Sequence, residues 1–293
     1  MPYMRILIIG LGNIGRTLAE RLRSGGHQVI GTTTTRAKVG GLRNSVDRVE
    51  VLYGHEQDKI IEAAAGCDAI VVTVAPDARK SATVEEREES YRKVLVNTCS
   101  NAAAASDRVI FASSFSVYGD GGRGDEPISE ESPTSNHDEP SSRYYQLAEK
   151  ATLTARHGCV LRLPDMYGAP GDMSYPDRVR MCHEYMGGKA IFSAAAPLYS
   201  IHYLDVVRSI EHVISEKLRG VYNVCNNERV PYTNEQVFNA ICDDEGMPRL
   251  EFLDHVKMPL RRISADKFYA TGYRTEYEDP NVQVVERWNT DTQ

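Results

Sequence analysis

The sequence has few features of a secreted, membrane-bound or metal-binding protein. Its six cysteines are scattered, without a C-x-x-C pair or a metal-type spacing to histidine, which predicts reduced thiols and no metal site. No apolar run approaches membrane-spanning length, and an apolar strand begins too early to leave room for a signal peptide. Lysine and arginine are dispersed, and the formal net charge is -7. We therefore expect a cytoplasmic protein with a small-molecule partner, and neither nucleic acid nor membrane.

The strongest pattern that is present lies near the N-terminus. An uninterrupted apolar run, residues 6–9, stops at Gly10, and apolar residues then recur at four-residue spacing from Ile14. This predicts a buried strand followed by an amphipathic helix. Gly10, Gly12 and Gly15 therefore fall at the turn with the spacing G-x-G-x-x-G, with Asn13 and Ile14 between them. This spacing predicts a dinucleotide site, with phosphate at the helix N-terminus.

The residues after the expected second strand indicate which dinucleotide is bound. A site selective for NAD has an acidic side chain near this strand end, which binds the ribose hydroxyls. Here Gly31 and four threonines, including Thr33, are followed by Arg36, whose guanidinium could pair with a 2'-phosphate. We therefore predict NADP as the cofactor, with NAD as the less favoured alternative.

Strand and helix patterns alternate five times up to residue 112 without a hairpin signal. This predicts an α/β fold, a Rossmann-type doubly wound parallel sheet with a small, discontinuous C-terminal substrate lobe. We expect the NAD(P)-binding domain to comprise residues 1–165 and about 201–225, and the lobe about 166–200 and 226–293. Ala75, at the end of the fourth strand, should pass under the cofactor. The tail from residue 254 is expected to have a helix near Ser264 and then mostly turns.

Candidate catalytic residues follow the fifth strand. Ser114 lies in the segment Ser-Ser-x-x-Val-Tyr-Gly, and hydroxyls at the carboxyl edge of a parallel sheet lie where ligands bind. A helix expected from about residue 141 carries Tyr144 and Tyr145. Because neighbouring helical residues point in different directions, at most one of these two tyrosines can face the site.

Several motifs occur in a family-specific order. The glycine loop, the Ser-Ser-x-x-Val-Tyr-Gly segment, Leu-Arg-Leu before Tyr-Gly-x-Pro-Gly, and His202 to Asp205 make the chain resemble the extended short-chain dehydrogenase/reductases, also called the NAD-dependent epimerase/dehydratase family. The resemblance covers about residues 4–275. It implies NAD(P) binding, with Asn97 near the cofactor and Ser114 polarising a substrate. A homodimer is common in that family and stays an open alternative here.

The chain departs from this family at the Tyr-x-x-x-Lys unit. In the register set by Glu149, Ser141 stands where the tyrosine should be and Tyr145 where the lysine should be. Without the lysine a tyrosine titrates near pH 10 and serves better as a donor than as a base. The same loss occurs in atypical family members.

Three functions remain open at this point. The favoured one is an NADP-dependent reductase of a small carbonyl, imine or sugar-derived compound, in which Ser114 polarises the substrate with help from Tyr145 or Tyr144. A nucleotide-sugar epimerase or dehydratase that recycles its cofactor is an alternative, although it needs a base. A non-catalytic NADP-binding regulatory protein is another.

Overall fold

The computed structural model describes residues 3–77, 81–137 and 139–291, and its central element is a seven-stranded sheet. The strands are β1 (Arg5–Ile9), β2 (Gln28–Thr33), β3 (Arg48–Val51), β4 (Ala69–Val72), β5 (Val109–Ser114), β6 (Cys159–Leu163) and β10 (Gly220–Asn223). They pair in parallel in the order β10-β6-β5-β4-β1-β2-β3. The order reverses between β1 and β4, which confirms the predicted doubly wound sheet.

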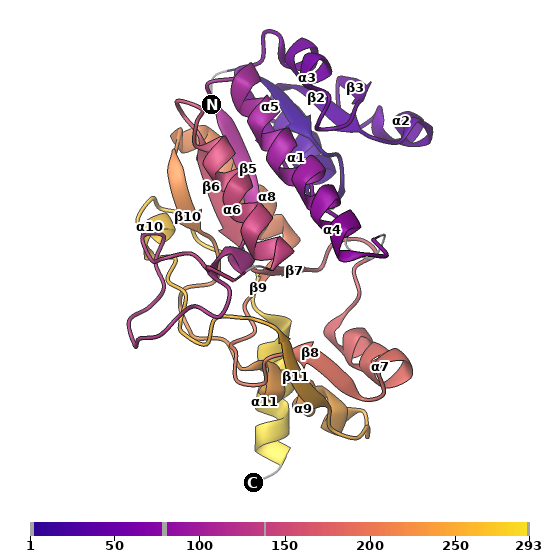
Figure 1. The fold of residues 1–293 in the computed structure, drawn as a ribbon, viewed down its shortest axis with the longest axis vertical. Coiled ribbons are helices and arrows are strands. Elements are labelled where there is room, and N and C mark those ends of the chain that lie inside the picture. Colours follow the sequence, from indigo (N-terminus) through magenta and orange to yellow (C-terminus); the bar gives the residue numbers. More distant parts are fainter. Residues whose placement is uncertain (1–2, 78–80, 138, 292–293) are drawn as a thin grey trace.

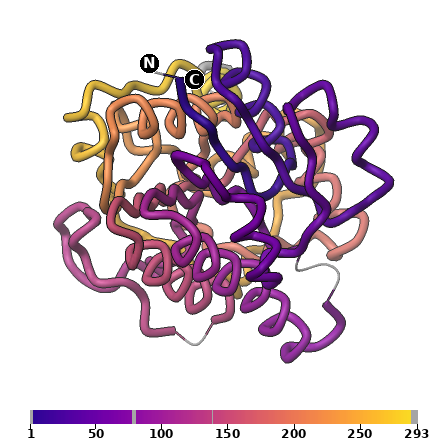
Figure 2. The backbone as a smooth tube through the Cα atoms, turned by 90° about the horizontal axis from the view of Figure 1, so that it is seen from above, coloured from indigo at the N-terminus to yellow at the C-terminus, as the bar shows by residue number. Residues whose placement is uncertain are grey.

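Helical segments cover both faces of this sheet or lie at its edges. They are α1 (Asn13–Ser24), η1 (Arg36–Lys38), α2 (Val39–Leu42), α3 (Gln57–Ala64), α4 (Val84–Tyr91), the π-helical η3 (Arg92–Asn97), α5 (Thr98–Ala105), η4 (Phe115–Tyr118), α6 (Pro140–Thr152), α8 (Tyr203–Glu216) and α10 (Asp266–Tyr269). One apolar cluster joins α1 and α8 to the sheet, and another joins α3, α5 and α6 to it. In Figure 2 the indigo first strands and the magenta middle of the chain lie on opposite sides, as the strand order requires.

The remaining elements gather at the lower end of the molecule in Figure 1. They are α7 (Tyr175–Met186), β8 (Lys189–Phe192), α9 (Asn234–Asp244), β11 (Glu251–Val256) and α11 (Pro280–Asp291). They share an apolar cluster of their own, and β8 pairs with β11. Between this lobe and the sheet, β7 (Asp165–Tyr167) pairs with β9 (Ser200–His202). No helix of the described residues could cross a membrane.

The structure corrects two expectations about the C-terminal part. The tail does not consist mostly of turns after residue 264, because α11 packs on α9 of the lobe. Residues 263–273 do not belong to the lobe, because Phe268 and Tyr273 are buried in the apolar cluster of the central sheet. The ring of Phe268 lies 5.5 Å from that of Tyr222 on β10. The expected domain boundary at residue 226 therefore placed this segment in the lobe, whereas it packs on the central sheet.

Asp205 holds a later part of the tail against α8. Asp205 lies in the first turn of α8, which begins at Tyr203 and whose N-cap is His202. The buried Asp205 carboxylate accepts hydrogen bonds from the backbone N–H groups of Glu276, at 2.9 Å, and Tyr277, at 3.0 Å. Asp205 thus fixes the backbone at Glu276 and Tyr277, which are distant from it in the sequence.

Candidate functional site

The glycine loop joins β1 to α1 at the point where the strand order reverses. Gly10 has φ +103°, a conformation that favours glycine. A Cβ on Gly15 would lie 2.1 Å from the carbonyl oxygen of Gly10, so this glycine lets the helix pack closely against the strand end. A Cβ on Gly12 would meet nothing within 4 Å. Of the three glycines of this loop, Gly12 is therefore the one with open space beside it.

The start of α1 is suited to an anion. Its first turn holds no acidic residue, and Gly12 at the N-cap offers no side chain to bind the free N–H groups. The Thr73 hydroxyl, just after β4, donates a 2.8 Å hydrogen bond to the Gly10 carbonyl oxygen and fixes the loop. Ile14 is buried against the core, whereas the exposed Asn13 side chain donates to the Pro170 carbonyl oxygen at 3.2 Å. The open space and the free N–H groups fit a dinucleotide diphosphate.

Arg36 lies at the far end of the same sheet edge, in η1 after β2. It lines a shallow hollow of about 510 Å³ together with Arg43, and Glu50 on β3 borders it. Glu50 is paired with Arg48 at 2.8 Å, whereas Arg36 has no hydrogen bond or ion pair within the described residues. The hollow therefore has a net positive lining that suits a phosphate.

Three other predicted cofactor residues lie along this edge. Thr33 ends β2, and its hydroxyl accepts from the Thr35 N–H at 3.2 Å. Ala75 is exposed two residues beyond Thr73, and a Cβ added on Gly10 would lie 2.9 Å from the adjacent Val74. Asn97 is half-buried at the end of η3, a π-helical turn of the kind often found at functional sites. All three residues thus lie along the edge at which the cofactor is predicted to bind.

Ser114 lines a cavity of about 370 Å³ between the sheet edge and the lobe. It ends β5, and its hydroxyl accepts from the Ser116 N–H at 3.1 Å, which fixes the start of η4. The opposite wall comes from α7, β8, α9 and the segment after β11. Parallel strands meet their ligands at this edge, so the cavity is the candidate substrate site.

Other polar residues of this cavity escaped the sequence analysis. The Ser116 hydroxyl is buried and has no hydrogen-bond partner in the described structure. Its position, two residues after Ser114 in the same motif, could have revealed it. Arg178 on α7, Asn234 on α9 and Lys257 after β11 also line the cavity. No motif marked these residues, because the lobe brings them in from three separate segments.

A buried polar network holds the segment that carries Ser114. The carboxylate of Glu149 on α6 accepts from the Ser113 hydroxyl at 2.6 Å and pairs with Arg162 on β6 at 2.8 Å. Arg162 also donates to the Tyr118 hydroxyl at 2.8 Å, which donates to Asn223 at 2.7 Å. The network therefore anchors residues on both sides of Ser114. Burial raises the pKa of Tyr118 to about 12, so this hydroxyl stays protonated.

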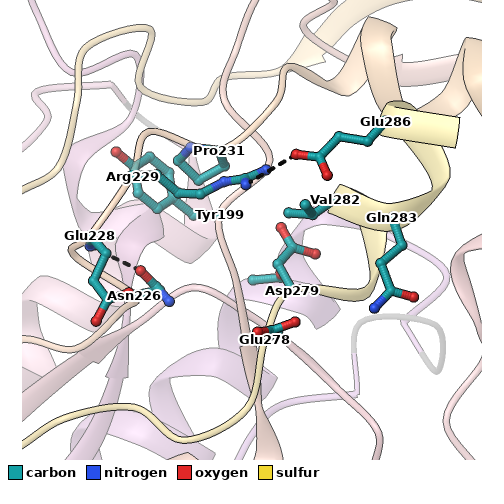
Figure 3. Close-up of a pocket in the computed structure, with 11 residues that line it drawn as sticks. Tyr199, Asn226, Glu228, Arg229, Pro231, Glu278, Asp279, Val282, Gln283 and Glu286 are labelled. Carbon is teal, nitrogen blue, oxygen red and sulfur yellow. Dashed lines mark hydrogen bonds and ion pairs between the residues drawn. The ribbon is translucent and has the colours of Figure 1, made fainter. Parts of the chain in front are cut away.

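A second cavity, of about 450 Å³, lies beside α11 (Figure 3). Four carboxylates and one arginine line it, and Arg229 reaches Glu286 at 3.4 Å. Burial raises the pKa of Asp279 at the start of α11. Among its described lining residues none is a predicted site residue, so the sequence motifs converge on the Ser114 cavity instead.

Comparison with known proteins agrees with this geometry. Residues 6–225 match the NAD dependent epimerase/dehydratase family. The chain belongs to this family. Protein YeeZ of Escherichia coli (strain K12) is 29% identical over 229 residues, which are 75% of this chain and 77% of YeeZ.

Solved structures share the fold. The Bordetella bronchiseptica enzyme WbmG in complex with NAD has a TM-score of 0.73 at 18% identity, covering 99% of this chain and 94% of that chain. DesIV (dTDP-glucose 4,6-dehydratase) from Streptomyces venezuelae, with NAD and TYD bound, has a TM-score of 0.73 at 19% identity, covering 98% of this chain and 97% of that chain. Family membership makes the protein an enzyme of the NAD-dependent oxidoreductase type.

The structure separates the two tyrosines on the helix where this family carries Tyr-x-x-x-Lys. Tyr144 is buried against α4, with its hydroxyl 3.5 Å from the Glu88 carboxylate, so it does not reach the Ser114 cavity. Tyr145 faces the sheet, stacked on Phe111 of β5 at 6.1 Å, and burial raises its pKa. The residue at the family's tyrosine position, Ser141, donates to Glu139 instead. Tyr145 thus lies toward β5, but like Tyr144 it is not among the residues that line the Ser114 cavity.

Proposed function

We propose that the protein is an NADP-dependent reductase of a small carbonyl or imine compound. The observation that carries the proposal is Ser114, a hydroxyl at the end of β5 that lines the cavity beyond the glycine loop. Gly10, Gly12 and Gly15 would hold the cofactor diphosphate, and Arg36 its 2'-phosphate. NADPH, when bound, supplies the hydride that reduces the substrate carbon and leaves as NADP⁺.

The protein's own groups then stabilise the charge that develops on the substrate oxygen. Ser114 donates a hydrogen bond to that oxygen, and Ser116 offers a second hydroxyl. The oxygen takes one proton, drawn finally from solvent, so hydride and proton together convert a carbonyl to an alcohol. Burial raises the pKa of Tyr145, so its hydroxyl stays protonated near neutral pH and no tyrosinate is available as a base. This favours reduction over an epimerase reaction that begins with proton abstraction.

The cofactor preference provides the first test. We expect NADPH to bind at least about tenfold more tightly than NADH, because a charge-assisted pair with the 2'-phosphate contributes about 1.5–3 kcal/mol. Arg36→Ala should remove this preference. Lys38→Ala should keep it, since Lys38 is an exposed cation of η1 that does not line the hollow. Fluorescence titration of the parent and both variants with NADPH and NADH measures all six affinities, and equal affinities in the parent would contradict the choice of NADP.

The reaction type needs a separate measurement. The absorbance of the purified protein should show no retained nicotinamide, and added NADPH should be oxidised only when a carbonyl compound is present. Tightly retained nicotinamide would favour the epimerase or dehydratase alternative, in which the cofactor is recycled. Binding of NADPH without oxidation across a panel of aldehydes and ketones would favour a regulatory protein.

A further inference from the structure

The lining of the Ser114 cavity carries information about its substrate. Ten of its seventeen lining residues are apolar, and they come from both the sheet side and the lobe. The rings of Phe192 and Phe238 meet edge to face at 6.2 Å within this wall. A volume of about 370 Å³ is at the small end of the range for small-molecule sites. The cavity therefore suits a small ligand with an apolar, ring-containing body.

Two cations border this apolar space. Arg178 and Lys257 line the cavity, against a single lining carboxylate, Asp165. Asp165 pairs with one terminal nitrogen of Arg178, and a guanidinium has five N–H donors, so Arg178 keeps donors for a ligand. The Lys257 ammonium contacts Asp254 at 2.9 Å, but Asp254 does not line the cavity. Among the lining side chains cations therefore outnumber carboxylates by one, which favours an anion over a cation as the ligand's charged group.

Two polar atoms in the wall have no partner within the described structure. They are the Ser116 hydroxyl and the side-chain oxygen of Asn234, a fully buried residue. The Asn234 amide nitrogen is already used, because it donates to the Ser193 carbonyl oxygen at 2.9 Å. A buried polar atom without a hydrogen bond costs free energy, so a polar group of a ligand that reaches either atom would gain a hydrogen bond there.

We propose that the substrate is a small carbonyl compound with an apolar ring and one carboxylate, rather than a nucleotide sugar. The reacting carbonyl lies at Ser114 and Ser116, the ring lies against the apolar wall, and the carboxylate faces Arg178 and Lys257. A nucleotide sugar would bring a base, two sugars and a diphosphate to a wall that is mostly apolar. This assignment rests on the proposed reductase function for the direction of the chemistry.

Binding without turnover tests the substrate class. Isothermal titration of the NADP⁺-saturated protein compares biphenyl-carboxylate with the uncharged biphenyl-carboxamide, which has the same ring body. We expect the carboxylate to bind at least about tenfold more tightly and the difference to shrink at high salt. Equal affinities, or tight binding of UDP-glucose with no binding of the carboxylate, would overturn the proposal.

Two lysine variants test which side chain causes the preference for the carboxylate. Lys257→Gln should weaken the carboxylate severalfold and leave the carboxamide unchanged. Lys189→Gln should change neither, since Lys189 is an exposed lysine of the same lobe that does not line the cavity. A loss of both ligands in Lys257→Gln, with unchanged thermal stability, would contradict a charge-specific role.

Turnover separates this proposal from the proposed function. With NADPH present, formylbenzoate should be reduced with a kcat/KM at least about tenfold above that of benzaldehyde. Failure to reduce either aldehyde, with the carboxylate still preferred in the titration, would refute the reductase and support the substrate class. Reduction of both with equal kcat/KM would support the reductase and refute the preference for a carboxylate.

Discussion

Two glycines of the same loop should respond in opposite ways when each is replaced by alanine. At Gly12 the added Cβ meets no atom within 4 Å, and the backbone, with φ -79° and ψ -162°, is one that alanine adopts. At Gly15 the added Cβ would lie 2.1 Å from the Gly10 carbonyl oxygen and 2.9 Å from the Thr73 hydroxyl. The first change therefore acts on the ligand site and the second on the fold.

The structure sets the expected size of each effect on stability and on NADPH affinity. Gly12→Ala should cost at most about 1 kcal/mol of unfolding free energy, the usual scale for an N-cap change. Gly15→Ala forces α1 away from the strand end and disturbs the buried contacts of Leu18 and Leu22, so we expect at least about 2 kcal/mol. For NADPH, the Cβ of Gly12→Ala takes the space of the diphosphate, and a loss of at least about 100-fold corresponds to about 2.7 kcal/mol.

Urea unfolding followed by circular dichroism gives the stabilities, and NADPH fluorescence gives the affinities. The informative result is a Gly12→Ala protein that is as stable as the parent yet binds NADPH poorly. Parent-like affinity in Gly12→Ala would show that no diphosphate lies at the start of α1. Parent-like stability in Gly15→Ala would show that the helix does not cross the strand end as closely as the structure has it.

Three further predictions concern the catalytic segment. Glu149→Gln should lower the unfolding free energy by about 3 kcal/mol, because it leaves Arg162 charged and buried without its partner. The control, Glu131→Gln, removes an exposed ion pair and should cost under about 0.5 kcal/mol. Urea unfolding measures both changes. Ser114→Ala should lower kcat about a hundredfold and keep NADPH affinity, as steady-state kinetics and titration will show. The reduction rate should be flat from about pH 6 to pH 9, because Tyr145, with a pKa above the ordinary tyrosine value of about 10, stays protonated there. Tyr145→Phe should then lower kcat less than Ser114→Ala does.

Each of these has a result that would contradict it. Equal stabilities of Glu149→Gln and Glu131→Gln would show that the buried pair does not anchor the segment. An unchanged kcat in Ser114→Ala, together with no turnover in Tyr145→Phe, would move the donor role to the tyrosine. A rate that changes steeply through neutral pH would indicate a titrating group in the reaction that the proposed donors do not provide.

The first third of the fold could be predicted because its signals are local. The apolar run before Gly10 and the four-residue spacing after it define a strand and a helix with no information from the rest of the chain. The alternation of such units restricts the topology, since parallel strands need crossover helices. The capping of α9 by Thr233 is local in the same way, because its partner Gln236 is three residues away.

The cavity could not be predicted, because its walls are distant in sequence. Ser114 stood out by its motif, but Arg178, Asn234 and Lys257 come from three segments that only the packing of the lobe brings together. The choice between Tyr144 and Tyr145 likewise depended on how α6 is rotated against α4 and β5.

The sequence by itself determined the glycine turn, the parallel sheet and the position of Ser114 at its edge, because each depends on residues within a few positions of one another. Only the tertiary structure decided what faces Ser114, which tyrosine turns toward the sheet, and where the tail packs. These outcomes depend on contacts between distant segments, such as Phe268 against Tyr222 and Glu149 with Arg162. Such contacts cannot be predicted from the spacing of residues within one segment.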